Sequence, residues 1–397
     1  MKYVSGLDGL RALACFLVIV LHYGYFSAGW VGVQLFFVLS GFLITRILLE
    51  NKPLPLGQYL KSFYLRRALR IFPLYFGVLV VALLVDHLCR LSSGQQAAQW
   101  ATLFTYTFNW YILDPHHTVL LTGWGHFWSL AVEEQFYLVW PFLLYAIPRA
   151  RMQTAMLAVI VGAFLLRLVI AIVTPILAQH YGMDHVQTPY ILTYYSTFTQ
   201  VDAFAIGGLV ATGFFDRVLV TTKHLVWALM GVVVMGGTIG VFAWTRGYLS
   251  LAQCWQGVGV VGQPDLYWFY VYGFTALNLF FALLILAAKQ GTLPFFSHPW
   301  LTRVGIISYG IYVFHNPLLL ILRHYMPVDC WTPAGFALFL GYCLLLYLIS
   351  LGSYNLFERY FLLLKDKLAP YDNTTTPASL TASTSVPYTG LAEGAPV

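Results

Sequence analysis

The stretch WVGVQLFFVLSGFLITRILL, residues 30–49, decides the fold class of this chain. As a helix it is long enough to cross roughly 30 Å of bilayer hydrocarbon, and Arg46 is its one charged residue. Similar apolar segments occur near 7–27, 64–86, 126–147, 152–178, 194–214, 225–244, 264–288, 304–324 and 333–359. The sequence therefore predicts an all-α fold, a polytopic transmembrane helical bundle of about ten spans.

The composition indicates lipid rather than water around most of the chain. Of 397 residues, 59% are hydrophobic and 9% are charged, whereas soluble domains carry about 25% charged residues. The net charge of +6 does not indicate a nucleic-acid partner, because the basic residues recur between the apolar segments, as in cytoplasmic membrane loops. The five cysteines show no metal-ligand spacing, so we expect no metal. We also expect no bound cofactor, with acyl-CoA as a co-substrate. Cys89, Cys254 and Cys330 fall in loops expected outside, where the sequence leaves a disulfide open.

The shorter apolar stretch at 99–113 determines the predicted topology. If it crossed the bilayer, later basic residues such as Arg149 and Lys289 would lie outside. If it re-enters or lies on the outer face, they lie inside, as the positive-inside rule favours, and about 15 residues are too few to cross. We therefore expect both termini in the cytoplasm and a multi-pass protein of the inner (cytoplasmic) membrane. A transmembrane domain is expected over 1–365 and a disordered cytoplasmic tail, rich in Thr, Ser and Pro, over 366–397.

Ionisable residues within apolar segments are costly in a bilayer and mark candidate functional positions. Arg11 and His22 are eleven residues apart, so a helix places both on one face, about 16 Å apart along its axis. Glu133 and Glu134 fall in the segment 126–147, where Glu133 is expected near the depth of His22. A carboxylate there can fix the tautomer of a general-base histidine, so His22 and Glu133 are predicted to be catalytic. A snorkelling arginine, a structural histidine and a buried ion pair are the structural alternatives.

A basic cluster lies at the inner end of the segment 64–86. Arg67 and Arg70 are three residues apart and share a helix face, and their guanidinium groups match phosphate oxygens. Plain anchoring at the membrane interface is the alternative. Asp202 and His315, in later apolar segments, are expected to join a polar network. This basic cluster at the cytoplasmic side lies below a predicted histidine–carboxylate pair. The arrangement fits a donor with a phosphate-rich head and a thin reactive arm, which is the shape of a coenzyme A ester.

Six stretches resemble, in order, motifs of the acyltransferase-3 family of membrane O-acyltransferases. They are LDGLRALACFLVIVLH (7–22), GWVGVQLFFVLSGFLIT (29–45), FYLRRALRIFPLY (63–75), GHFWSLAVEEQFYLVWP (125–141), VDAFAIGGLVA (201–211) and ISYGIYVFHNP (307–317). Their order makes the resemblance specific, and it covers about residues 5–360. It implies acyl transfer from cytoplasmic acyl-CoA to hydroxyl groups of cell-surface glycans, lipid-linked sugars or small molecules such as macrolides.

The resemblance also implies roles for individual residues. The essential histidine is similar in place to His22, the motif glutamate to Glu133, and the donor-binding group to Arg11, Arg67, Arg70, Ser40 and Gly41, with Glu134, Asp202, Tyr309 and His315 as further members of a polar network. The pattern departs from the family at Glu358, which is followed by Arg359 and Tyr360 where members often have Glu-x-Pro. Some members also carry an extra-membrane hydrolase-like domain, which we do not find, so acceptor delivery is expected within the bundle or through a partner.

We expect a membrane-embedded O-acyltransferase that moves an acyl group, in the first place acetyl, from acyl-CoA to a carbohydrate hydroxyl. The expected partners are membrane lipid, acyl-CoA and a glycan or glycolipid acceptor, with a periplasmic or membrane protein partner left open. Two alternatives stand beside this reading. One is a macrolide-type small-molecule acyltransferase, and the other is a proton-coupled transporter in which His22, Glu133 and Asp202 relay protons. The sequence leaves the acceptor, the acyl chain length, the oligomeric state and direct transfer versus an acyl-enzyme undecided.

Overall fold

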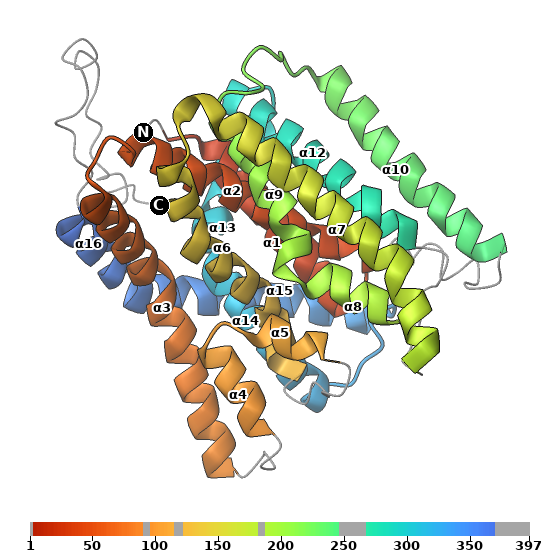
Figure 1. Ribbon diagram of the computed structural model, residues 1–397. Coiled ribbons are helices and arrows are strands. Elements are labelled where there is room, and N and C mark those ends of the chain that lie inside the picture. The colour runs from red at the N-terminus through yellow and green to blue at the C-terminus, as the bar shows by residue number, and fades with distance from the viewer. Residues whose placement is uncertain (1–2, 90–95, 115–121, 182–186, 246–266, 370–397) are drawn as a thin grey trace.

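In the computed structural model, residues 3–89, 96–114, 122–181, 187–245 and 267–369 are described, and every regular element within them is a helix (Figure 1). In chain order the elements are α1 (Ser5–Tyr23), η1 (Ser27–Trp30), α2 (Val31–Asn51), α3 (Leu56–Cys89), α4 (Ala97–Phe104), α5 (Phe108–Leu113), η3 (Thr122–Phe127), α6 (Trp128–Ala146), η4 (Arg149–Arg151), α7 (Met152–Tyr181), α8 (Gln187–Tyr195), α9 (Thr197–Ala211), α10 (Thr222–Thr245), α12 (Tyr267–Gln290), η7 (Pro294–Ser297), α13 (Pro299–Ile306), α14 (Ser308–Tyr325), α15 (Pro333–Ser353), the π-helical turn η8 (Tyr354–Glu358) and α16 (Arg359–Leu368). The apolar segments are helical over most of their described parts, so the all-α prediction is confirmed.

Six helical stretches of the described chain are long and apolar enough to cross a membrane. They lie in α1, α2, α3, α7, α12 and the run from α15 to α16, and the pair α13 and α14, bent by 69°, would add a seventh. The multi-span bundle is thus confirmed, but these stretches do not confirm about ten spans. Glu133, Glu134 and Gln135 lower the mean hydropathy of α6, and α9 has only 15 residues. The cytoplasmic placement of the termini stays a prediction.

The stretch 99–113 folds as the two short helices α4 and α5, with a turn between them at Tyr106, where φ is 53°. The helices have 8 and 6 residues. They therefore extend only about 12 Å and 9 Å along their axes, far less than the hydrocarbon thickness of roughly 30 Å. This agrees with the prediction that the stretch does not cross the bilayer as a helix.

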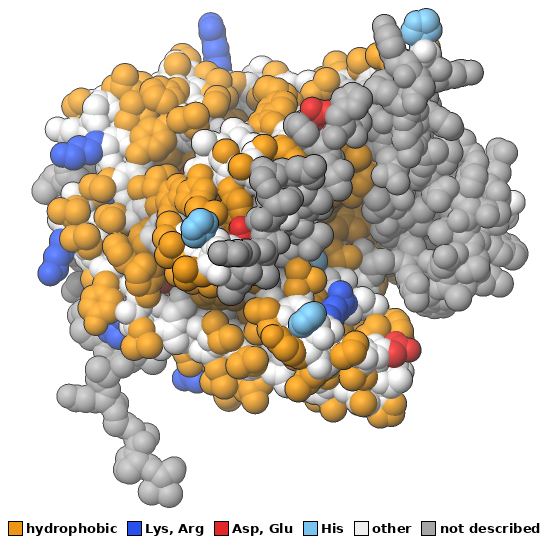
Figure 2. All heavy atoms as spheres, turned by 90° about the horizontal axis from the view of Figure 1, so that it is seen from below, with side chains coloured by type: hydrophobic (Ala, Val, Ile, Leu, Met, Phe, Trp, Pro, Cys, Tyr) orange, Lys and Arg blue, Asp and Glu red, His pale blue; other side chains and the backbone are white. Residues whose placement is uncertain are grey.

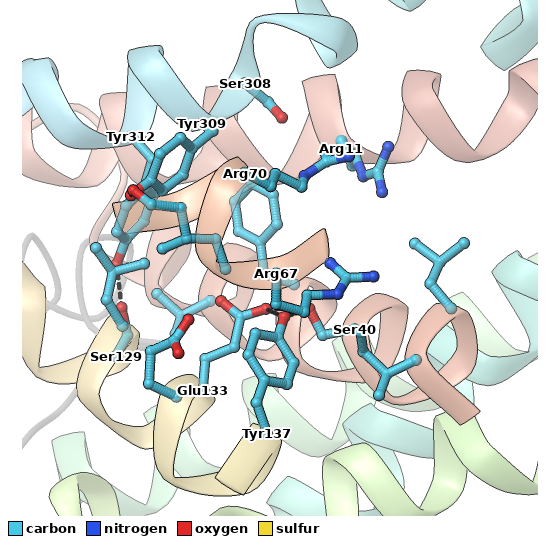
Figure 3. A pocket seen from close by; sticks show the side chains of 17 residues that line it. Arg11, Ser40, Arg67, Arg70, Ser129, Glu133, Tyr137, Ser308, Tyr309 and Tyr312 are labelled. Carbon is cyan, nitrogen blue, oxygen red and sulfur yellow. Dashed lines mark hydrogen bonds between the residues drawn. The ribbon is translucent and has the colours of Figure 1, made fainter. Parts of the chain in front are cut away.

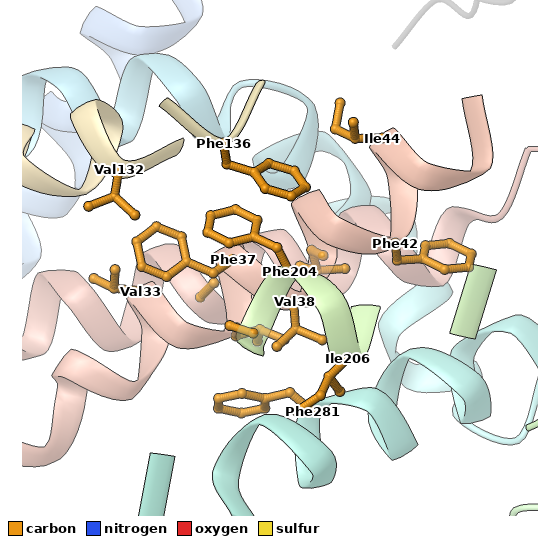
Figure 4. Packing of buried hydrophobic residues seen from close by; sticks show 14 of the residues in the cluster. Val33, Phe37, Val38, Phe42, Ile44, Val132, Phe136, Phe204, Ile206 and Phe281 are labelled. Atoms are coloured by element: carbon orange, nitrogen blue, oxygen red, sulfur yellow. The ribbon is translucent and has the colours of Figure 1, made fainter. Parts of the chain in front are cut away.

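The helices α2 and α9 pack at the centre of the bundle (Figure 4). The rings of Phe37 and Phe204 face each other with their centroids 4.9 Å apart. A glycine on each helix lets the backbones approach. A Cβ atom at Gly41 would lie 2.1 Å from the Phe204 carbonyl oxygen, and one at Gly207 would lie 2.1 Å from the Val38 carbonyl oxygen. Small residues allow such close crossings of helices in membranes, so this glycine pair determines how tightly the core closes.

The last helix, α16, lies alongside α3 (Figure 1). Arg66 on α3 binds it through Asp366, at 3.1 Å, and through the carbonyl oxygen of Ala369, at 2.5 Å. The predicted domain end at 365 is therefore too early by about one helical turn, because residues up to 369 pack against α3. The rest of the predicted tail, 370–397, lies outside the described residues.

Hydrophobic side chains cover most of the described surface of the face shown in Figure 2, with charged groups scattered between them. On α6 and α10, for example, Leu138 and Val234 are exposed. An outer surface of this kind is stable in lipid and not in water. Cys330 is a free thiol, whereas Cys254 and the side chain of Cys89 lie outside the described residues.

Candidate active site

A cavity of about 100 Å³ lies between α1, α2, α3, α6 and α14. Its polar lining consists of Arg11, Ser40, Arg67, Arg70, Ser129, Glu133, Glu134, Tyr137, Ser308, Tyr309 and Tyr312. Seven residues predicted from the sequence are therefore brought together here, namely Arg11, Ser40, Arg67, Arg70, Glu133, Glu134 and Tyr309. Figure 3 shows the three arginines on one side of the cavity and Ser129 with Tyr312 on the other.

Glu133 is held in this cavity by two hydroxyl groups. Ser40 on α2 and Tyr137, one turn further along α6, both donate hydrogen bonds to its Oε1 atom. The two donors come from two helices, so the carboxylate has a defined position. The expected pairing of Glu133 with His22 is wrong as a direct contact, because the described partners of Glu133 are these hydroxyl groups.

The three arginines of the cavity differ in the partners that the protein provides for their positive charges. Arg11 forms an ion pair of 2.5 Å with Asp8, one turn earlier on α1. Arg67 lies over the ring of Tyr137, with 5.5 Å from its guanidinium carbon to the ring centroid. Among the described residues, neither Arg67 nor Arg70 is in an ion pair. Both are therefore available to an anionic ligand, for which guanidinium forks suit phosphate oxygens.

His22 lies in a cluster of three imidazole rings rather than in the cavity. The ring centroid of His22 is 4.8 Å from that of His315 and 6.5 Å from that of His126. His22 Nδ1 lies 2.9 Å from the carbonyl oxygen of Val18, one turn earlier. A carbonyl only accepts hydrogen bonds, so Nδ1 carries the proton and the neutral ring presents a bare Nε2, the form that a general base requires.

Ser129 and Tyr312 border both the cavity and the histidine cluster. Their hydroxyl oxygens lie 2.5 Å apart (Figure 3). The Tyr312 hydroxyl also lies 3.2 Å from the carbonyl oxygen of His126. The Tyr312 ring also packs against the rings of His126 and His315, with centroids 5.4 Å away in each case. The arginine-lined cavity and the histidine cluster thus lie next to each other, with the hydrogen-bonded Ser129 and Tyr312 as a wall between them.

Asp202 lies away from the cavity, in a buried network that joins α7, α9 and α12. It pairs with Arg167 at 2.7 Å, and both side chains are fully buried. Thr275 donates to the same carboxylate oxygen at 2.8 Å, and Arg167 also donates to Thr275 at 2.5 Å. Asp202 thus lies in a polar network with Arg167 and Thr275 rather than with His315, and its contacts give it a bracing position between helices.

Three further predicted residues have positions that refine their roles. Gly41 faces the backbone of α9 and does not line the cavity, so packing rather than donor contact explains the glycine. The Tyr309 hydroxyl donates to the carbonyl oxygen of Ile71, at 2.9 Å, and ties α14 to α3. The Oε1 atom of Glu134 is buried without a hydrogen-bond partner in the described chain, which leaves it free for a ligand.

Glu358, whose motif departs from the family pattern, is nevertheless buried. It lies on the π-helical turn between α15 and α16, and Ser353 donates to its Oε1 atom at 2.9 Å. A Cβ atom at Gly310 would lie 3.3 Å from that oxygen, so the carboxylate is close to the start of α14. The missing proline thus does not remove the carboxylate from the bundle.

Several residues of the cavity, the histidine cluster and the Asp202 network were not identified from the sequence. They are Asp8, His126, Ser129, Tyr137, Arg167 and Tyr312. Arg167 could have been found, because it is an ionisable residue in the middle of a long apolar segment. His126 stands at the edge of a quoted motif, but only the tertiary structure places its ring beside His315, with the centroids 4.5 Å apart.

Comparison with known proteins identifies the family of the chain. The sequence profile of the acyltransferase-3 family, described as an acyltransferase domain, matches residues 4–354. The chain is 29% identical to the peptidoglycan O-acetyltransferase OatA of Listeria monocytogenes over 333 residues, 80% of this chain and 50% of that protein. It is 28% identical to the O-acetyltransferase OatA of Staphylococcus aureus over 339 residues, 82% of this chain and 52% of that protein. The chain thus spans about half the length of these relatives.

No solved structure matches the chain. The profile nevertheless covers nearly every helix of the bundle, including those that carry Arg11, His22, Arg67, Glu133 and His315. A match over this much of the sequence establishes the family, and the protein belongs to the acyltransferase-3 family of membrane acyltransferases.

Proposed function

We propose that the protein transfers an acyl group, in the first place acetyl, from acyl-CoA to a hydroxyl group of a carbohydrate. The observation that carries this proposal is the meeting, in one cavity, of a fixed carboxylate and two arginines that have no ion pair in the described chain, next to a histidine with an unprotonated Nε2. Family membership supports the reaction class. The names of the relatives, which are O-acetyltransferases, support acetyl as the group and a glycan as the acceptor.

The donor is bound through its charged head. The phosphates of acyl-CoA contact Arg67 and Arg70, which line the cavity and form no ion pair in the described chain. Arg11, held by Asp8 at 2.5 Å, contributes a third positive charge at a defined position. The pantetheine arm enters the cavity, where Glu133 and the unpartnered oxygen of Glu134 can accept hydrogen bonds from its amide groups.

Transfer takes place at the wall between the cavity and the histidine cluster. The thioester end of the donor reaches Ser129 and Tyr312, and the acceptor hydroxyl lies at His22 Nε2. His22 removes the hydroxyl proton as the oxygen attacks the thioester carbonyl carbon. The carbon–sulfur bond then breaks, and the thiolate takes the proton from His22 and leaves as the free thiol of coenzyme A. Direct transfer requires no covalent enzyme intermediate, so it is the simpler scheme.

The acceptor is a surface carbohydrate or a lipid-linked sugar. Peptidoglycan is the first candidate, because one relative is named for it. The setting is the inner membrane, with the donor supplied from the cytoplasm, in keeping with the basic residues at the inner helix ends.

The first experiment is acetyl transfer by the purified full chain in detergent. Radiolabelled acetyl-CoA is offered with peptidoglycan fragments, other glycans and macrolides, to wild type and to His22→Ala. We expect label on a glycan with wild type only, and label on a macrolide alone would change the acceptor class. Folded wild type that neither binds acetyl-CoA nor transfers label, across several acyl lengths, would overturn the proposal and favour a transporter.

A further inference from the structure

The three clustered histidines come from three separate elements. His22 is on α1, His126 is on η3 and His315 is on α14. The His315 ring is the central one, with its centroid 4.8 Å from that of His22 and 4.5 Å from that of His126. His126 and His315 are 4% and 1% exposed, whereas His22 is half-buried. A half-buried histidine is thus backed by two buried ones.

Backbone contacts determine the tautomers of two of these rings. The Nδ1 atom of His315 lies 2.6 Å from the carbonyl oxygen of Tyr312, as Nδ1 of His22 lies 2.9 Å from that of Val18. Each Nδ1 must therefore donate, and each neutral ring keeps a lone pair on Nε2. The Nε2 atom of His315 is buried and has no hydrogen-bond partner among the described residues. A buried acceptor without a donor is costly unless a donor arrives during function.

That donor arises when His22 takes up a proton. The imidazolium form of His22 has an N–H group at Nε2 as well as at Nδ1. We propose that His315 is a positioning residue for His22, and that its bare Nε2 shares the proton that His22 takes from the acceptor hydroxyl. The inference rests on the proposed function for the source of that proton. The proton returns to the leaving thiolate, so both histidines end each turnover neutral.

The surroundings of the pair contain few competing groups. Arg323 donates to the carbonyl oxygens of His22 and Tyr23 at 2.9 Å each, so it is the nearest described cation to this pair. The Tyr312 hydroxyl is engaged with Ser129, and Glu133 lies across that wall, bound by its own two hydroxyl donors. Both nitrogens of His126 are buried without a partner in the described chain. Its ring is farther from His22 than that of His315, so it serves as the comparison residue.

The test measures the protonation of His22 without any acyl donor. The purified full chain is treated with diethyl pyrocarbonate, which acylates neutral imidazole, across a pH series, and modification of His22 is followed by peptide mass spectrometry. A hydrogen bond to a charged group corresponds to about one pH unit or more in such a titration. We therefore expect His315→Leu to lower the pH midpoint of His22 modification by about one unit. His315→Gln keeps an oxygen acceptor, so it should restore most of the shift.

Two control variants distinguish the loss of the shared proton from a general disturbance of the structure. Tyr342→Phe removes the hydroxyl that donates to the His315 carbonyl oxygen, at 2.8 Å, and leaves the imidazole in place, so its midpoint should match wild type. His126→Gln should shift the midpoint less than His315→Leu does. An unchanged or raised midpoint in His315→Leu would overturn the shared proton, as would a wild-type His22 that the reagent never modifies. Because no transfer is measured, failure here is distinct from failure of the acyltransferase proposal.

Discussion

The hydroxyl oxygens of Ser129 and Tyr312 lie 2.5 Å apart, and this contact joins α6 to α14 at the wall between the arginine-lined cavity and the histidines. Both side chains are buried, so the bond is shielded from competing water. The proposed reaction has to bring a thioester in the cavity to a hydroxyl group at His22. This wall is therefore the place where a small change should affect the chemical step more than donor binding.

Tyr312→Phe and Ser129→Ala each remove one partner of that contact. We expect kcat for acyl transfer to fall roughly two- to tenfold in each, which corresponds to a net hydrogen bond of about 0.5–1.5 kcal/mol. The KM for acyl-CoA should stay close to that of wild type, because the arginines are untouched. Steady-state kinetics of the two single variants and the double variant test this. If the two losses multiply in full in the double variant, the residues do not act through their shared bond.

Arg67→Ala and Arg70→Ala should raise the KM for acyl-CoA. The loss of a charge-assisted hydrogen bond of about 1.5–3 kcal/mol corresponds to roughly a ten- to hundredfold change. Arg66→Ala is the matched control, because Arg66 is on the same helix turn but pairs with Asp366 at 3.1 Å. Initial rates measured against donor concentration give the KM of each of the three variants. An equal rise in KM for Arg66→Ala would mean that net charge, and not contact with the donor, is responsible.

The buried pair of Arg167 and Asp202 should matter for stability rather than for chemistry. Removing one member leaves an uncompensated charge, so Arg167→Met or Asp202→Leu should each lower the free energy of unfolding by about 3–5 kcal/mol. The double variant should recover much of this loss, since no lone charge remains. Thermal unfolding in detergent, read by tryptophan fluorescence, measures the three variants. A double variant that is as unstable as the sum of the singles would show that the pair does not act as a unit.

Gly41→Ala should destabilise the bundle without weakening donor binding. Its Cβ atom would meet the Phe204 carbonyl oxygen at 2.1 Å, and crowding of a packed core costs about 1–3 kcal/mol. Gly341→Ala, on α15, is the control, because a Cβ atom there meets nothing within 4 Å. The melting temperature and the KM for acyl-CoA are measured side by side. A higher KM at an unchanged melting temperature would show that Gly41 contributes to donor binding, as the sequence predicted.

The helices themselves could be predicted from the sequence, because each is an apolar run of the length that a bilayer demands. The same physics pointed to Arg11, Arg67, Arg70 and Glu133, since a charge within such a run is costly and needs a reason. It also indicated that 99–113 does not cross. The number of spans was harder to predict, because Glu133, Glu134 and Gln135 make α6 polar while it packs in the middle of the bundle.

Only the tertiary structure determined which of these polar groups contact one another. Hydropathy reports the depth of a residue along a helix, but the rotation of the helix and its neighbours are set by packing, such as the crossing at Gly41 and Gly207. Because of that packing, Glu133 accepts hydrogen bonds from Ser40 and Tyr137 rather than pairing with His22. It brings His315 beside His22, although 293 residues separate them in the chain, and no local pattern encodes a contact between side chains so far apart in sequence.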